Sequence, residues 1–269
     1  MDYNTRENIF KLAKEWVLEA GGKIRNTIDD PLEVSSKSNP NDLVTTMDKN
    51  TEKFFVNKIK TTFPDHLLLS EEGFGDDLDS LDGTVWIIDP IDGTMNFVQQ
   101  KRNFAISVGV YHEGIGEIGL IYNVMEDELY SAKRGEGAFK NDKKLPLLEK
   151  GIRLEESVIG LNHFWLCENR LVDEKVMQNL VKTARGSRTY GSAALEFAYV
   201  AEGILEGYLT MGLSPWDIAA GMVIVSEVGG ITTNIDGNPI NMVGRNSVFV
   251  GHPDVHKRII EDFIQKGRK

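Results

Sequence analysis

The chain has 269 residues, and its 41 Asp and Glu against 30 Lys and Arg give a formal net charge of −11. This charge argues against a nucleic-acid partner, because binding to a phosphate backbone depends on Lys and Arg. A content of 41% hydrophobic and 26% charged residues is typical of a folded globular protein and excludes a disordered chain. No apolar run approaches a membrane span, no signal-peptide pattern is present, and Cys167 is the single cysteine, so we expect a cytoplasmic protein without a membrane partner.

Helices and then strands are predicted for the N-terminal half, residues 1–148. Apolar residues over 9–20 recur every three or four positions, and Gly21-Gly22 is predicted to end this first helix. A second helix is predicted over 48–63. Strands are predicted over 66–70, 84–89, 103–112, 117–124 and 128–133. Because their connections are short, we expect an antiparallel meander, which makes this half α+β.

Extended and helical segments alternate in the C-terminal half, residues 149–269, which is typical of an α/β layered arrangement. The charged stretch 149–156 is the predicted seam between the halves. Extended segments are predicted over 157–162, 204–210 and 247–251, and helices over 168–183, 193–201, 217–228 and 253–265.

Two patterns match ligand motifs without their usual context. Gly114, Gly116 and Gly119 fit the GxGxxG pattern of dinucleotide sites, but a strand-like segment follows them, so we predict a hairpin turn. His252 and His256 have the spacing of a zinc-binding pair. No carboxylate or thiol is placed to complete the ligand set, and we predict a solvent-facing pair on the last helix.

Acidic residues concentrate in residues 61–100, which contain nine Asp and Glu but no Lys or Arg. Carboxylates without cationic neighbours require solvent or a bound cation. Four of the nine are predicted to form a solvated loop, namely Asp76, Asp77, Asp79 and Asp82.

A metal site is predicted where an apolar strand ends within this stretch. Asp89 ends the strand, Pro90 interrupts it, and Asp92 follows three residues later, so the two carboxylates are expected to converge. Their oxygens and the carbonyl of Ile91 suit Mg²⁺ or Mn²⁺. The following pair, Gly93-Thr94, is predicted to offer backbone N–H groups to an anion such as phosphate.

The same carboxylates also fit structural roles that need no metal. An Asp-Pro-x-Asp-Gly turn is common on protein surfaces. Glu71-Glu72, after the strand 66–70, either adds a carboxylate to the same sheet edge or caps a turn. Asp48 also fits a capping box at the start of the second helix, and Asp217 fits either a metal ligand or the N-cap of the following helix.

Taken together, these residues resemble the inositol monophosphatase family of metal-dependent phosphomonoesterases. The family signatures are Glu71-Glu72, the segment 86–97 (WIIDPIDGTMNF) and the segment 216–221 (WDIAAG), in the expected order and at the expected separations. Segments 44–49 and 191–194 also fit. The resemblance implies a layered αβαβα sandwich of mixed α+β and α/β character, two or three Mg²⁺ ions, lithium sensitivity and a homodimer.

The resemblance further implies that a metal-activated water attacks a phosphomonoester in line. Two ions would share one aspartate, with a third, weaker ion beside them. The implied metal ligands are Glu71, Asp89 and the Ile91 carbonyl for the first ion, Asp89, Asp92 and Asp217 for the second, and Glu71 and Asp48 for the third. The implied catalytic residues are Thr94, Glu71 and Asp48, and the implied substrate contacts are Asp92, Gly93, Thr94, Gly191, Ser192, Ala193 and Thr210.

The position of Thr210 leaves the substrate open. Many inositol-selective members of the family carry glutamate seven residues before the WD aspartate, where this chain has Thr210. The neutral hydroxyl removes a charge-assisted contact with inositol. We therefore expect an inositol-phosphate phosphatase with relaxed selectivity, and the alternatives on the same site are an NADP 2′-phosphatase and a fructose-1,6-bisphosphatase.

Two other classes of protein compete with this hypothesis. A haloacid-dehalogenase-type phosphatase carries D-x-D-G-T near its N-terminus, whereas this chain has D-P-I-D-G-T near residue 90. The first aspartate of that motif becomes phosphorylated, which requires a different geometry. A non-catalytic cation-binding protein with an acidic face would bind ions and release no phosphate.

Overall fold

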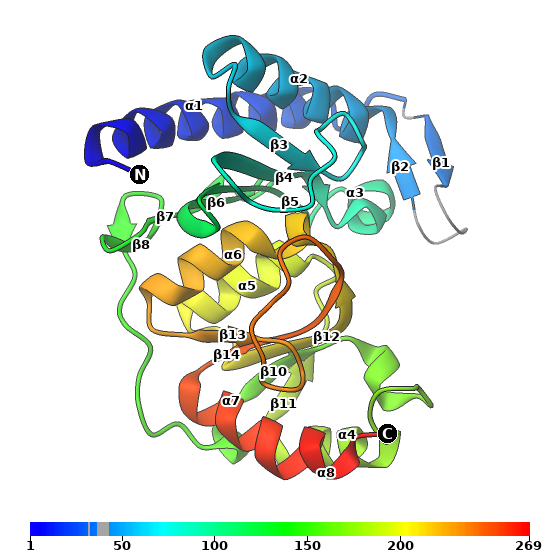
Figure 1. Cartoon of the computed structure of the whole chain (residues 1–269). Helices are drawn as coiled ribbons and strands as arrows, with labels where there is room; N and C mark the ends of the chain where they lie inside the picture. The colour runs from blue at the N-terminus through cyan, green and yellow to red at the C-terminus, as the bar shows by residue number, and fades with distance from the viewer. Residues whose placement is uncertain (32, 37–42) are drawn as a thin grey trace.

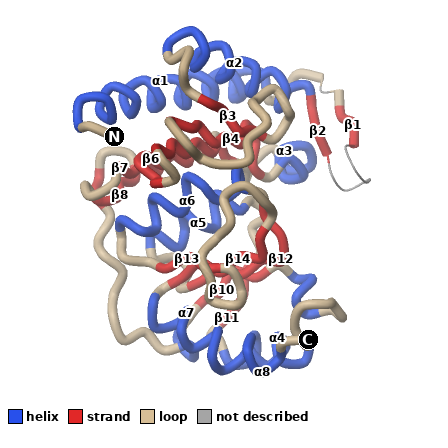
Figure 2. The backbone as a smooth tube through the Cα atoms, in the orientation of Figure 1, coloured by secondary structure: helices blue, strands red, loops and turns tan. Residues whose placement is uncertain are grey.

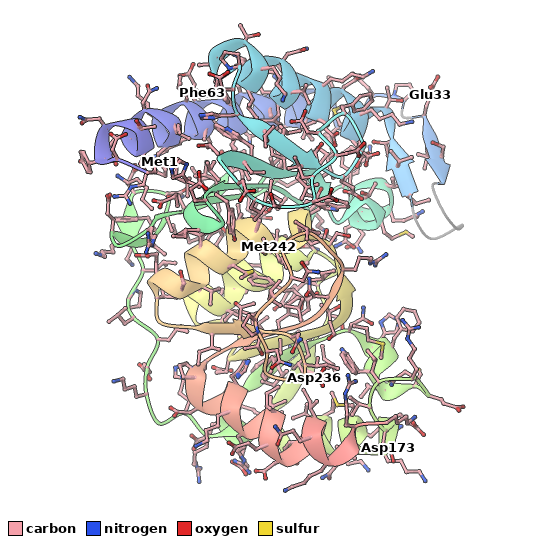
Figure 3. All side chains as sticks on the ribbon, viewed as in Figure 1. Met1, Glu33, Phe63, Asp173, Asp236 and Met242 are labelled. Atoms are coloured by element: carbon pink, nitrogen blue, oxygen red, sulfur yellow. The ribbon has the colours of Figure 1, made fainter. Side chains whose placement is uncertain are left out.

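The computed structural model describes residues 1–31, 33–36 and 43–269. Its elements stack in five layers, helix, sheet, helix, sheet, helix, which confirms the predicted αβαβα sandwich (Figure 1). Three bands of helix enclose the two sheets (Figure 2), and side chains fill the spaces between the layers (Figure 3). None of the described helices combines the length and the apolarity needed to cross a bilayer. The helical layers consist of α1 (Tyr3–Thr27) and α2 (Thr46–Thr62), of α5 (Ala193–Glu202) and α6 (Pro215–Glu227), and of α4 (Glu174–Thr183), α7 (Pro253–Ile259) and α8 (Gln265–Gly267).

The first sheet has seven strands in the order β3-β4-β5-β6-β7-β8-β9. From β4 onward neighbouring strands are antiparallel, so the predicted meander is confirmed there. It is wrong for β3, which runs parallel to β4, because the connection over 71–83 carries the chain back along the sheet. The carboxyl ends of β3 and β4 therefore lie at one edge. The strands are β3 (Leu67–Ser70), β4 (Thr84–Asp92), β5 (Ala105–His112), β6 (Ile115–Asn123), β7 (Glu128–Lys133), β8 (Gly137–Lys140) and β9 (Lys143–Lys144).

The second sheet has five strands in the order β11-β10-β12-β14-β13. Strand β10 is parallel to both neighbours, and β14 is antiparallel to β12 and β13. The division of the chain into halves at 148 and 149 stays a prediction. The strands are β10 (Val158–Leu161), β11 (Gly186–Arg188), β12 (Gly207–Leu213), β13 (Ile231–Thr233) and β14 (Asn246–Gly251). The remaining elements are the pair β1 (Val34–Ser36) and β2 (Leu43–Thr45), helix α3 (Thr94–Gln100), the 3₁₀ helices η1 (Leu154–Glu156) and η2 (His163–Leu166), and the π-helix η3 (Ile260–Ile264).

Helix α1 continues to Thr27, so the predicted end at Gly21-Gly22 is wrong. Gly21 is buried against Tyr122 of β6, and a Cβ at this position would lie 2.2 Å from the Cε1 atom of the ring. The glycine allows the helix to approach the sheet closely rather than ending it. Gly22 faces open space, since no heavy atom would lie within 4 Å of a Cβ there.

Helix α6 packs on the opposite face of the same sheet through small residues. A Cβ added at Gly109 would lie 2.8 Å from that of Ala219, and one added at Gly119 would lie 2.4 Å from the carbonyl oxygen of Ala220. Gly119 thus has a packing role, and the predicted hairpin turn is confirmed between β5 and β6. The hydroxyl of Tyr111 also donates to the carbonyl of Ala219 at 3.0 Å, which holds the first turns of α6 against the sheet.

The prediction of a solvent-facing histidine pair on the last helix is wrong. His252 and His256 are buried, with 3% and 6% of their surfaces exposed, because α7 packs on β14. The His256 ring stacks on Phe249 and hydrogen-bonds the Thr233 hydroxyl at 2.9 Å. The predicted solvated loop is confirmed at Asp77, Asp79 and Asp82, which are exposed. Asp76 differs, because it is half-buried and accepts hydrogen bonds from Lys60 and from the backbone N–H of Leu68.

Candidate active site

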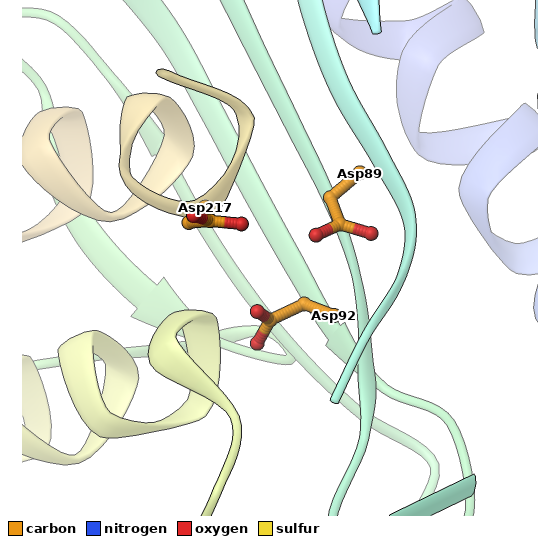
Figure 4. A group of neighbouring side chains, drawn as sticks. All are labelled: Asp89, Asp92 and Asp217. Atoms are coloured by element: carbon orange, nitrogen blue, oxygen red, sulfur yellow. The ribbon is translucent and has the colours of Figure 1, made fainter. Parts of the chain in front are cut away.

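Three aspartates from two elements converge beside the edge of the seven-stranded sheet (Figure 4). Asp89 and Asp92 belong to the end of β4, and Asp217 belongs to the first turn of α6. One carboxylate oxygen from each residue lies within 4.8 Å of the others. Across the described part of the chain, no other group of three or more His, Cys, Asp or Glu brings its ligand atoms together in this way. The site is therefore a metal-binding acidic cluster made only of oxygen ligands.

Strand β4 reaches Asp92, so the predicted end of the strand at Pro90 is wrong. Asp89 pairs with Ser107 of β5 and Asp92 pairs with Ala105, so three steps along β4 match two along β5. Such a β-bulge changes the side on which the following side chain projects. The two carboxylates converge as expected, but the cause is a bulge in a continuous strand.

Burial and mutual repulsion dominate the electrostatics of the cluster. Burial raises the pKa of Asp89 well above its usual range, and the charges of Glu71, Asp92 and Asp217 add to the rise. Burial also raises the pKa of Asp92 and of Asp217, against hydrogen bonds that favour their ionised forms. Ionising these carboxylates costs free energy both because they are buried and because they repel one another. A bound cation offsets both costs.

Glu71 lies beside the cluster, because β3 and β4 are parallel and end at the same edge. Its side chain hydrogen-bonds that of Asp89, and its charge raises the pKa of Asp89. The turn that carries Glu71 is held by Glu52, a fully buried residue of α2. The Glu52 carboxylate accepts hydrogen bonds from the hydroxyl of Ser70 and from the backbone N–H groups of residues 72 and 74, at 2.6 to 2.8 Å.

Glu52 is not among the residues expected from the sequence to belong to the site. A signal was available, because positions 48, 52, 55 and 59 share one face of α2 and are all buried. A glutamate at a core position of an amphipathic helix is rarely left without partners. That pattern predicts a buried acceptor.

Asp48 is both the capping-box partner of Thr45 and a neighbour of Thr94. It forms the predicted capping box with Thr45, whose backbone N–H donates to Oδ2 of Asp48 at 2.8 Å. The Thr94 hydroxyl oxygen lies 3.2 Å from Oδ1 of Asp48 and 3.2 Å from the carbonyl oxygen of Ile91. The hydroxyl has one hydrogen to donate and two lone pairs. When it donates to Asp48, it can accept a hydrogen bond from a water in the site.

The start of α5 contacts Asp92 directly. The Ser192 hydroxyl and the backbone N–H of Ala194 both donate to Oδ2 of Asp92, the latter at 2.8 Å. Ser192 is also the N-cap residue of α5, with its Oγ accepting the N–H of Leu195. Ala193 lies between these two donors, at the first position of the helix. The structure therefore brings Ser192 and Ala193 to the cluster.

Gly93 and Gly191 bring two backbone segments into contact at the cluster. Both adopt positive φ angles, of 94° and 79°. A Cβ at Gly93 would lie 3.1 Å from the carbonyl oxygen of Gly191, so the contact requires glycine. The N–H groups of Tyr190 and Gly191 donate to Oε1 of Glu196, at 2.9 and 3.3 Å. The N–H of Gly191 is thus already engaged.

Asp217 and Thr210 complete the predicted set. The N-cap of α6 is Ser214, so the predicted N-cap role of Asp217 is wrong. Asp217 is the third helical residue and accepts the N–H of Ser214 at 2.7 Å in a capping box. Thr210 is buried on β12, on the same face as Tyr208, whose pKa is raised by burial and by the charges of Glu196, Asp92 and Asp217.

The sequence profile of the inositol monophosphatase family matches residues 5–268. The chain belongs to this family. Among relatives of this inositol monophosphatase family member, inositol-1-monophosphatase of Bacillus subtilis is 52% identical, over 95% of this chain and 96% of that protein. Inositol monophosphatase 1 of Bos taurus is 32% identical, over 91% and 90%. The family resemblance and the enzyme class expected from it are confirmed.

Solved structures agree with this assignment. Inositol monophosphatase II from Staphylococcus aureus superposes with a TM-score of 0.87 at 43% identity, covering 96% of each chain. A crystal structure of SaIMPase-II with bound inositol monophosphate gives a TM-score of 0.85 at 40% identity, over 96% of this chain and 94% of that one. A staphylococcal inositol monophosphatase-1 soaked in LiCl, at 28% identity over 97% and 96%, gives 0.88. The haloacid-dehalogenase alternative is thereby set aside.

Proposed function

We propose that this chain is a Mg²⁺-dependent phosphatase that hydrolyses inositol monophosphate. The observation that carries the proposal is the convergence of Asp89, Asp92 and Asp217 in a buried site. The names of the Bacillus and bovine relatives support the activity, and the SaIMPase-II structure with bound inositol monophosphate supports the substrate. An inositol monophosphatase/NADP phosphatase structure, at 28% identity, contains Mg²⁺ and phosphate, which supports the choice of metal.

The donor set fits hard divalent cations, because the converging atoms are carboxylate oxygens. When bound, Mg²⁺ supplies positive charge that binds phosphate oxygens and makes a coordinated water more acidic. Mn²⁺ accepts the same oxygen ligands. In this proposal the residues that hold two ions are Glu71, Asp89, the Ile91 carbonyl, Asp92 and Asp217, and a third ion lies near Glu71 and Asp48.

Thr94 and Asp48 are proposed to manage the proton of the attacking water. The Thr94 hydroxyl lies within hydrogen-bond distance of Asp48. Thr94 can therefore accept a proton from the water while it passes its own hydroxyl proton to the Asp48 carboxylate. Burial raises the pKa of Asp48, which makes it a better proton acceptor. Glu71, whose charge contributes to the raised pKa of Asp48, is proposed to orient the same water.

Substrate contacts are proposed for the segments that meet at the cluster. The α5 start, with Ser192 and Ala193, and the Gly93-Thr94 turn would contact phosphate and sugar hydroxyls. Asp92 would accept a substrate hydroxyl, and Gly191 would contribute through its carbonyl, since its N–H is engaged by Glu196. Thr210 would face the polyol. We also propose a homodimer in the cytoplasm, as the family resemblance implies, which light scattering and cell fractionation test.

A second candidate function is hydrolysis of a larger phosphomonoester on the same site. A Thermotoga maritima relative, 35% identical, is named fructose-1,6-bisphosphatase/inositol-1-monophosphatase. A SaIMPase-II structure, 42% identical, contains 2′-AMP. Both support the relaxed selectivity expected from the neutral side chain of Thr210.

The test is a phosphate-release panel with and without Mg²⁺, using inositol 1-phosphate, fructose 1,6-bisphosphate, NADP and 3′-phosphoadenosine 5′-phosphate. We expect inositol 1-phosphate to give the highest kcat/KM, and chelation by EDTA to abolish turnover. Asp92→Asn should retain the fold and lose at least about 100-fold in turnover, because it removes a proposed ligand of the second ion and a negative charge. Release from none of the four substrates, or an aspartyl-phosphate at Asp89 in a rapid-quench sample, would contradict the proposal.

A further inference from the structure

A cavity of about 260 Å³ lies where the connector between the two sheets passes the end of α5. The connector, residues 145–153, runs along the side of the molecule in Figure 1. It is held at two points. The backbone N–H of Leu148 donates to the carbonyl of Val228 at 2.9 Å. The N–H of Gly151 donates to the carboxylate of Asp254, in the first turn of α7, at 2.7 Å. The cavity is therefore built by the fold.

His252 lines this cavity with a ring that has no hydrogen-bond partner among the described residues. Both ring nitrogens are buried, and His252 is the only side chain in the described part of the chain with two such atoms. The residue as a whole is 3% exposed. Its backbone N–H donates to the carbonyl of Glu206 at 2.9 Å, which places the two residues side by side. Because buried polar atoms in native proteins nearly always have partners, the two nitrogens indicate a polar ligand.

The charged side chains that line the cavity are all glutamates, and no lysine or arginine of the described chain joins them. Glu202 is compensated, since Lys140 lies 3.0 Å from its carboxylate. Glu149 and Glu206 have no ion-pair partner among the described residues. The C-terminal end of α5 also contributes to the lining, and the carbonyl groups at that end of a helix carry partial negative charge. The cavity therefore favours a cation.

The hydrogen-bonding groups select the kind of cation. Burial lowers the pKa of His252, so its ring is neutral at neutral pH and has one acceptor nitrogen and one N–H donor. A metal ion lacks a ligand set here, because no three His, Cys, Asp or Glu of the described residues converge at this place. An ammonium group can pair with the carboxylates and donate to the imidazole at once. Leu148, Ile152 and Leu205 add apolar lining that suits an alkyl chain.

We propose that this cavity binds a small aliphatic amine, whose ammonium pairs with Glu149 and Glu206 and donates to His252. The volume lies below the range of about 300–1,000 Å³ that is typical of pockets for drug-sized ligands, so the amine is small. The site is separate from the acidic cluster. It lies at the C-terminal end of α5, whereas Ser192 and Ala194 at the other end contact Asp92. The helix between them is roughly 15 Å long.

The experiment is isothermal titration calorimetry of the full chain, at saturating Mg²⁺ and fixed ionic strength. The probes are 1,4-diaminobutane and n-butylamine. The control ligands are n-butanol, which has the alkyl body without the charge, and tetramethylammonium, which has the charge without N–H donors. Nα-acetyl-lysine amide is a further probe, because it carries the same ammonium on a peptide-like body.

The variants are Glu206→Gln and His252→Phe. Glu206→Gln removes the charge and keeps an oxygen that can accept the N–H of Val158, as the carboxylate does at 2.6 Å. His252→Phe keeps a ring and removes both nitrogens. The matched control is Glu126→Gln, which removes one exposed negative charge outside the cavity.

Wild type is expected to bind both amines and neither control ligand. Each lining variant should raise the Kd for n-butylamine by at least about 10-fold, because it removes a hydrogen bond to a charged group. Glu126→Gln should change the Kd by less than about twofold, since solvent and salt screen an exposed distant charge.

Three results would overturn the inference. They are the absence of amine binding by wild type, wild-type affinity in Glu206→Gln, and tighter binding of Nα-acetyl-lysine amide than of n-butylamine. The last would assign the cavity to a lysine of a partner protein. If His252→Phe does not fold, Glu206→Gln alone decides. Because the measurement is of binding and not of phosphate release, this inference and the proposed function can fail independently.

Discussion

The carboxylate of Glu52 in α2 accepts the backbone N–H of Glu72 at 2.6 Å. The same carboxylate accepts hydrogen bonds from Ser70 and Phe74, so a single buried side chain fixes the turn that follows β3. Glu71 lies inside that turn. The position of a proposed metal ligand thus depends on a residue that contacts no metal itself.

Glu52→Gln should weaken both the fold and the affinity for Mg²⁺. The amide nitrogen would face a backbone N–H instead of accepting from it, and charge-assisted hydrogen bonds contribute about 1.5–3 kcal/mol each. We expect a loss of about 2 kcal/mol in the free energy of unfolding and a several-fold higher half-saturating Mg²⁺ concentration. Urea unfolding and Mg²⁺-dependent phosphate release measure these two effects. The control is Glu15→Gln, at an exposed position of α1. Unaltered Mg²⁺ dependence would show that Glu52 does not position Glu71.

The hydroxyl of Thr94 should be required for turnover, while its methyl group should not. Thr94→Val removes the hydroxyl near Asp48 and keeps the shape, so we expect kcat to fall by about 100-fold or more. Thr94→Ser keeps the hydroxyl and should retain most of the activity. Single-turnover phosphate release at saturating Mg²⁺ distinguishes the two. Comparable losses in both variants would indicate a packing role for Thr94 instead.

Stability should fall as the pH rises from about 4.5 to about 7 because of Glu196. Burial raises the pKa of Glu196 from 4.5 to about 7 in the folded chain. A carboxylate with a raised pKa favours folding at pH values below about 4.5, and this contribution is lost as the pH rises toward 7. The difference between the pKa values in the unfolded and folded chain corresponds to roughly 3 kcal/mol in the free energy of unfolding. Glu196→Gln cannot ionise, so its stability should depend less on pH than that of wild type.

Thermal unfolding at pH 5, 6, 7 and 8 in saturating Mg²⁺ tests this expectation. Bound metal keeps the aspartate cluster ionised throughout, so the difference between variant and wild type isolates Glu196. The Tm of wild type should fall more than that of Glu196→Gln between pH 5 and pH 8. Parallel Tm profiles would mean that Glu196 does not titrate in this range.

Adjacent glycines in α1 should respond oppositely to alanine. At Gly21 a Cβ meets the ring of Tyr122 at 2.2 Å, so Gly21→Ala overpacks the contact and should cost about 1–3 kcal/mol. At Gly22 nothing lies within 4 Å, so Gly22→Ala should stabilise the helix by up to about 1 kcal/mol. Each is the control for the other in urea unfolding. Equal effects of the two substitutions would contradict the close packing of α1 on β6.

The convergence of Asp89 and Asp92 is predictable from the sequence because the two residues are local. They lie within four residues, and the same segment supplies Ile91 and Thr94, so one motif contains several residues of the proposed site. The bulge that makes Asp89 and Asp92 converge was not predicted, because it depends on the register between β4 and β5. Register is a property of two strands together, and the segment alone does not reveal it.

Residues whose role depends on distant partners were harder to predict. Gly21 ends no helix because Tyr122, far along the chain, packs on it. His252 and His256 are buried because α7 packs on β14. Glu52 has partners in a turn that the chain forms only after β3. In each case the local sequence is compatible with two structures, such as a helix that ends or continues, or a polar side chain that is exposed or buried. Packing against distant residues decides between them.

The close contact of α6 with Gly109 and Gly119 ties ion binding to the packing of two layers. Asp89 and Asp92 are in place once β4 and β5 pair, but Asp217 joins them only when α6 is docked on that sheet. A cation bound by all three aspartates would therefore stabilise the contact between α6 and the sheet, and removal of the cation would weaken that contact.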